Sequence, residues 1–118
     1  MSVGVVGDLV TRGVRTIRVD RRTPLGNPYV MRDEADRDDV CDAYRQLLGE
    51  SLRGDVGDQR VREIGIEHGF RGHVVSWNAR EAAAEVGRLR RICACHDVRL
   101  DCHCAPMRCH AEEIARVL

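Results

Sequence analysis

The sequence is poor in aromatic residues, carries no net charge and contains no long hydrophobic run. Its 118 residues include one Trp, two Tyr and one Phe, and 19 basic residues balance 19 acidic ones. Proteins that bind single-stranded nucleic acid by stacking need more aromatic side chains, and general polyanion binders are usually strongly basic. The composition therefore argues against general nucleic-acid binding, while it leaves room for a local arginine site.

The first ten residues are too short to span a membrane and do not resemble a signal peptide. They lack a basic start, and Asp8 interrupts their apolar residues. We therefore expect a cytoplasmic protein that does not bind membranes. In a reducing cytosol, the six cysteines favour metal binding, catalysis or burial over a disulfide framework. Their even number keeps the disulfide framework open as an alternative.

Strand-like and helix-like segments alternate along the chain. Short β-branched or alternating runs predict strands at residues 3–6, 14–19, 73–77 and 98–104. Helical periodicity predicts helices at residues 36–49, 58–69, 78–95 and 111–118. We therefore expect one small α/β domain, residues 1–118, with a partly parallel sheet covered by helices in a Rossmann-like arrangement. The strands at 73–77 and 98–104 should be parallel, because the intervening helix allows a right-handed crossover.

Two helix boundaries are predicted from single residues. Asn78 is followed three residues later by Glu81, which is typical of a capping box at a helix start. Gly49 follows an apolar stripe that includes Cys41 and Tyr44, and it predicts the end of that helix. Both helices should cover the sheet with their apolar faces.

Three cysteines and two histidines lie within nine residues near the C-terminus, at 102–110. The segment connects a predicted strand to a predicted helix, which is where open α/β sheets hold their ligands. Cys109 and His110 fall at the helix start, where unpaired N–H groups and the helix dipole stabilise a thiolate. One interpretation is therefore that Cys109 is a nucleophile and that His110 or His103 transfers protons.

The same cysteines allow two other interpretations. Cys102, Cys104, Cys109 and His110 supply the three sulfur atoms and one nitrogen that a tetrahedral zinc ion accepts. In a straight strand, however, the Cβ atoms of Cys102 and Cys104 would lie about 6–7 Å apart, which is wide for one ion. The third interpretation is that these cysteines are small core residues and that His110 only makes local hydrogen bonds.

A second group of candidate residues lies in the loop Arg21–Tyr29. Two prolines stiffen this loop, Gly26 permits a positive φ or a close backbone approach, and Asn27 offers a donor and an acceptor. Arg21 and Arg22 could hold a phosphate or carboxylate through paired hydrogen bonds. The alternative is a structural turn with solvated arginines. The loop lacks the glycine-rich phosphate motifs, so it indicates no nucleotide class.

Together the two segments resemble a family of small bacterial and phage proteins called domain of unknown function 4326. Its first motif, Arg-x-Ser/Thr-x-Trp/Leu-Gly-Asn-Pro-Phe/Tyr, is matched by Arg21, Thr23, Leu25, Gly26, Asn27, Pro28 and Tyr29. Its second motif, Cys-x-Cys-x-Pro-x-x-Cys-His, is matched by Cys102, Cys104, Pro106, Cys109 and His110. The chain departs from the family at His103, where tryptophan is common, and at Ala111, where glycine is usual. The resemblance spans residues 15–118 and implies a shared site without a known reaction.

We therefore expect the two segments to border one pocket for a small anionic, phosphorylated or nucleotide-like molecule. In the leading hypothesis the protein is an enzyme in which Arg21 holds the anion, Asn27 orients the substrate, and Cys109 and His110 are catalytic. The remaining predicted ligand-binding residues are Thr23, Gly26, Cys104 and Arg108. A protein that sequesters the same molecule without turnover would use the same pocket. The other alternative is a non-catalytic binding module with a structural zinc ion, the one cofactor that the sequence suggests. The sequence predicts no oligomeric state.

Overall fold

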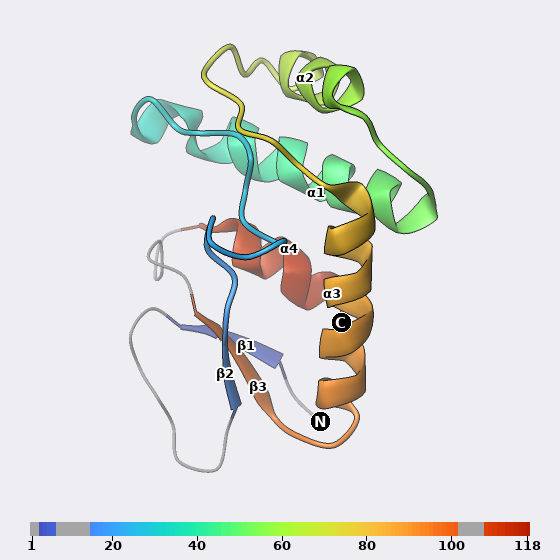
Figure 1. Cartoon of the computed structure of the whole chain (residues 1–118). Helices are drawn as coiled ribbons and strands as arrows, with labels where there is room; N and C mark the ends of the chain where they lie inside the picture. The colour runs from blue at the N-terminus through green and yellow to red at the C-terminus, as the bar shows by residue number, and fades with distance from the viewer. Residues whose placement is uncertain (1–2, 7–14, 102–107) are drawn as a thin grey trace.

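The computed structural model describes residues 3–6, 15–101 and 108–118 (Figure 1). In chain order the elements are β1 (Val3–Val6), β2 (Arg15–Arg18), η1 (Glu34–Asp36), α1 (Arg37–Arg53), α2 (Asp58–Glu67), α3 (Ala79–Cys93), β3 (Val98–Asp101) and α4 (His110–Val117). They form a mixed α/β fold, as the alternating sequence pattern predicts. None of the described helices is long and apolar enough to cross a membrane.

The described strands form one three-stranded parallel sheet with the order β1-β3-β2. Val98 of β3 lies opposite Val3 of β1 on one side and opposite Arg15 of β2 on the other. Three of the predicted strands are therefore confirmed over the residues that the structure describes. Because the strands are parallel, all their carboxyl ends lie at one edge of the sheet, and the loop that follows β2 starts there.

The segment at 73–77 is not a strand of this sheet, so the prediction that it pairs with 98–104 is wrong. Val74 forms an isolated antiparallel bridge with Tyr29. Val30 N–H donates to the His73 carbonyl at 2.9 Å, and Val75 N–H donates to the Pro28 carbonyl at 2.8 Å. The loop that contains the first motif thus takes the hydrogen bonds that a sheet neighbour would have taken.

Helix α1 continues beyond Gly49, so the predicted end of this helix is also wrong. The helix ends at Arg53, and the Gly54 N–H donates to the Glu50 carbonyl at 3.0 Å. Ser51 is still buried on the inner face of the helix, where its hydroxyl accepts a 3.1 Å hydrogen bond from Trp77 Nε1. A glycine inside a helix costs about 1 kcal/mol relative to alanine, and tertiary packing outweighs that cost here.

The start of α3 is confirmed, because the Asn78 side chain accepts a 3.0 Å hydrogen bond from the Glu81 N–H. Helix α1 packs against α2, α3 and α4, while α4 packs against β1 and β3 (Figure 1). Tyr44 of α1 joins several of these parts. Its ring meets the rings of Trp77 and His110 edge-on, and its hydroxyl donates to the Leu25 carbonyl at 2.7 Å.

Candidate functional site

A cavity of about 300 Å³ lies where the loop after β2 meets the start of α4. Residues of both predicted motif segments line it, including Arg21, Asn27, Arg108, Cys109 and His110. The fold therefore brings together residues from opposite ends of the sequence, at the carboxyl edge of the sheet. These five residues, two from the first segment and three from the second, therefore line one cavity.

The first motif forms a tight turn in which Gly26 lies against the backbone of the preceding residues. A Cβ atom at Gly26 would come within 2.4 Å of Arg21 Cα and 2.6 Å of the Asp20 carbonyl oxygen. The close backbone approach, and not a positive φ, is therefore what requires a glycine here. Thr23 closes the same turn, since its N–H and its hydroxyl both donate to the Asp20 carbonyl, at 2.9 and 2.8 Å. Thr23 and Gly26 shape the loop and line a different cavity.

Asn27 holds the loop against α1. Its Oδ1 accepts from the Tyr29 N–H at 3.0 Å, and its Nδ2 donates to the Val40 carbonyl at 3.3 Å. The side chain is buried, so these backbone bonds replace the water that it would otherwise bind. Asn27 thus positions the loop, and the role of orienting a substrate that the sequence suggests would compete with these bonds.

The Arg21 side chain lines the cavity and is held by a hydrogen bond at Nε, while its terminal amino groups have no partner among the described residues. Its Nε donates to the Asn27 carbonyl at 3.1 Å. Its two terminal amino groups make no hydrogen bond or ion pair with the residues that the structure describes. Because a guanidinium stays charged and offers donors in a planar fork, this end of Arg21 suits a carboxylate or a phosphate.

His110 is the first residue of α4 and is almost completely buried. Its Nε2 lies 2.7 Å from the Val19 carbonyl oxygen, which can only accept, so Nε2 carries a proton. Burial lowers the pKa of His110, and the positive charge of Arg21 acts in the same direction, against the Val19 carbonyl and Asp20. His110 is therefore neutral at pH 7, with Nδ1 as an acceptor that lies 3.4 Å from Cys109 Sγ.

Cys109 caps α4, and its Sγ accepts from the Ala111 N–H at 3.5 Å. The residue is 1% exposed and takes part in a disulfide bond. The thiolate that the sequence suggests can therefore form only after this bond is reduced. Among the described residues, no three metal-ligating side chains lie together. The predicted zinc ligands Cys102 and Cys104, and the alternative proton carrier His103, lie outside the described residues.

Arg108 connects helices α1 and α4 through hydrogen bonds to carboxylates on both. Its guanidinium donates to Asp38 at 3.0 Å and to Asp42 at 2.7 Å on α1, and to Glu113 at 3.4 Å on α4. The pKa of Arg108 is raised, chiefly by the hydrogen bond with Asp42. Its own carbonyl accepts from Arg37 Nη1 at 2.7 Å. A ligand would have to displace these carboxylates, so the contacts of Arg108 favour a structural role over the predicted ligand-binding role.

The sequence matches the family model described as Domain of unknown function (DUF4326) over residues 10–118. The chain belongs to this family. The match contains both motif segments, the loop after β2 and the cysteine-rich junction before α4. No curated protein and no solved structure matches the chain.

Sequence reasoning missed two backbone carbonyls at this site. The carbonyl of Val19 holds the ring of His110, and the carbonyl of Val40 holds Asn27. Backbone atoms leave no trace in a residue pattern, so no sequence signal could have identified them. Arg37 and Cys41, near the start of α1, are among the further lining residues that were missed.

Proposed function

We propose that the cavity between the loop and α4 binds a small anionic molecule of phosphorylated or nucleotide-like character, and that the protein is an enzyme acting on it. The observation that supports the proposal is that the open end of Arg21 and the buried His110 line the same cavity. The volume of about 300 Å³ is at the lower end of the range for small-molecule sites. Arg21 would bind the anionic group, and the rest of the molecule would extend toward His110.

The orientation of the His110 ring supports its role as a general base. The Val19 carbonyl orients the ring through Nε2, which leaves Nδ1 to accept a proton. After a cellular thiol reduces its disulfide, the Cys109 thiol would pass its proton to Nδ1 at 3.4 Å, and the sulfur electron pair would form a bond to an electrophilic centre of the substrate. The bond from that centre to the leaving group would break, and the leaving group would take up the proton from Nδ1. A thiol, a base and a group that orients the base are the parts of a nucleophilic site.

The proposal also concerns the fold around the cavity and the cellular location of the protein. The loop starts at the carboxyl edge of a parallel sheet, which is where Rossmann-like folds bind their ligands. We therefore propose that the protein is Rossmann-like and binds its ligand at this edge of the sheet. We also propose a cytoplasmic location, because reducing conditions would keep Cys109 in its reactive form.

Calorimetric titration with adenosine monophosphate and with uncharged adenosine tests the binding step. We expect the monophosphate to bind, and Arg21→Gln to weaken its binding at least tenfold. Arg22→Gln is the matched control, because Arg22 is paired with Asp20 at 2.8 Å and lines a different cavity. Equal losses in the two variants, or equal binding of adenosine, would contradict an anion site at Arg21.

A second experiment tests catalysis. Reduced protein is incubated with a panel of nucleoside phosphates, and mass spectrometry detects products. We expect turnover by the wild type and none by Cys109→Ser or His110→Gln, with binding retained in both variants. Binding without turnover by the wild type across the panel would support a protein that sequesters its ligand instead.

One observation favours the alternative of a non-catalytic module with a structural zinc ion. Two ligands of one tetrahedral zinc would have their sulfur and nitrogen atoms about 3.6 Å apart, and Cys109 Sγ lies 3.4 Å from His110 Nδ1. A carbonyl that accepts from the other ring nitrogen is also common behind a zinc-bound histidine. Metal analysis of reduced protein separates the two functions. One equivalent of zinc, with unfolding on chelation, would favour the module, and folded metal-free protein would favour the enzyme.

A further inference from the structure

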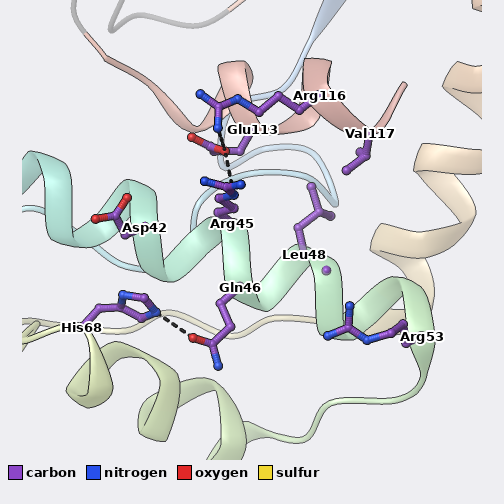
Figure 2. Close-up of a pocket in the computed structure, with 10 residues that line it drawn as sticks. Asp42, Arg45, Gln46, Leu48, Arg53, His68, Glu113, Arg116 and Val117 are labelled. Carbon is purple, nitrogen blue, oxygen red and sulfur yellow. Dashed lines mark hydrogen bonds and ion pairs between the residues drawn. The ribbon is translucent and has the colours of Figure 1, made fainter.

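A second cavity, of about 570 Å³, lies between α1, α4 and the end of α2 (Figure 2). It shares no lining residue with the cavity at the loop and α4. Three arginines line it: Arg45 and Arg53 from α1, and Arg116 from α4. Val117 and the backbone at Gly49 form a less polar part of its wall.

One buried carboxylate faces these arginines. The side chain of Glu113 is 1% exposed, and its Oε2 accepts no hydrogen bond from the described residues, while its Oε1 accepts from Arg108 at 3.4 Å. Arg45 Nε lies 3.9 Å from Oε2, and Arg116 Nη1 lies 3.5 Å from it. Figure 2 shows the two guanidinium groups on either side of this carboxylate. Both distances are longer than a good hydrogen bond, so much of the donor capacity of the two arginines is left for another acceptor.

The other charges near the cavity do not neutralise the arginines. Asp42 also lines the cavity, but it accepts a 2.7 Å hydrogen bond from Arg108. Arg53 makes no hydrogen bond or ion pair with any described residue, and its charge acts at longer range on Glu50. Asp42 and Glu113 are the two carboxylates among the lining residues, so the three arginines give the wall an excess of positive charge.

We propose that this second cavity binds a small organic phosphate. The phosphate group would lie among Arg45, Arg53 and Arg116, whose planar forks suit its oxygens. The organic part would lie against Val117 and the backbone at Gly49, the less polar part of the wall. Glu113 is a positioning residue, because it holds Arg45 and Arg116 on one side of the cavity. The cavity volume lies within the range for small-molecule sites.

Phenyl phosphate is the probe that tests the proposal, with neutral phenol and inorganic phosphate as comparison ligands. Each is titrated into ¹⁵N-labelled protein while amide chemical shifts are recorded. We expect phenyl phosphate to shift the amides of Gly49, Arg53 and Val117 more strongly than either comparison ligand does. Shifts confined to the first cavity, no saturable shift, or equal effects of phenol would overturn the proposal.

Substitutions of the arginines test whether these side chains bind phenyl phosphate. We expect Arg53→Gln to raise the dissociation constant at least threefold, and Arg45→Gln with Arg116→Gln to raise it at least tenfold. Arg80→Gln is the control, because Arg80 is exposed and lies on α3 outside this cavity. If the double variant does not fold, Arg53→Gln still decides, since no ion pair of the described residues is lost. Equal weakening by Arg80→Gln would overturn the proposal.

The Arg21→Gln variant keeps this test separate from the proposed function. Phenyl phosphate should still shift Gly49 and Val117 in that variant, whatever happens at the first cavity. Loss of those shifts in Arg21→Gln would contradict an independent second site.

Discussion

Nε2 of His110 donates a 2.7 Å hydrogen bond to the carbonyl oxygen of Val19, 91 residues earlier in the chain. This bond connects the start of α4 to the residue that follows β2, at the carboxyl edge of the sheet. It also decides which ring nitrogen carries the proton and directs Nδ1 toward Cys109. The loop and α4 are therefore parts of one structure, and a change in the loop should affect His110.

The turn at Gly26 gives the first prediction. Gly26→Ala should lower the free energy of unfolding by about 1–3 kcal/mol, because the added Cβ would overlap backbone atoms of Asp20 and Arg21. Gly54→Ala is the control, since no heavy atom lies within 4 Å of a Cβ at that position. Urea unfolding of both variants measures the difference. Equal stability of the two variants would show that the turn adapts without cost.

The second prediction concerns stability at acidic pH. Hydrogen bonds from Arg60, and then from Gln46, lower the pKa of Glu50 to about 2. In the unfolded chain Glu50 has a higher pKa, of about 4.3, so its ion pair stabilises the fold above that pH. This stabilisation should be lost as the pH falls from about 4.3 toward 2. Arg60→Gln should therefore lower stability at pH 6 and have little effect near pH 2.

Denaturant unfolding between pH 2 and 7 checks this pH dependence. Arg62→Gln is a suitable control, because Arg62 lies on the same helix and forms no ion pair with the described residues. Its curve should follow that of the wild type. A difference between Arg60→Gln and the wild type that stays constant over this whole range would contradict the proposed linkage.

The third prediction is the order in which cysteines react. Cys95 is exposed, whereas Cys93 is buried and its pKa is raised by that burial. Iodoacetamide without a reductant should therefore label Cys95 first, and Cys93 and Cys41 only on unfolding. Cys109 should require both reduction and access. Peptide mapping by mass spectrometry measures the order, and early labelling of Cys109 in folded, unreduced protein would contradict it.

Local signals were sufficient for several parts of this protein. Asn78 and Glu81 predict the start of α3, because a capping hydrogen bond joins neighbours in the sequence. The strands β1 and β2 are predicted by short β-branched runs. The two motif segments, and with them the family, can also be identified from residue order alone.

Tertiary contacts decided the rest. Val74 pairs with Tyr29 and not with the sheet, and α1 continues through Gly49 because its inner face packs against Trp77. The sequence by itself identified Arg21, Asn27, Cys109 and His110 as candidate residues, and these four line the cavity. Only the fold decided that Asn27 and Arg108 are bound to their neighbours while the end of Arg21 stays open among the described residues. The physical reason is that hydrogen-bond partners far apart in the sequence come together only in the folded chain. Residue spacing therefore does not predict these contacts.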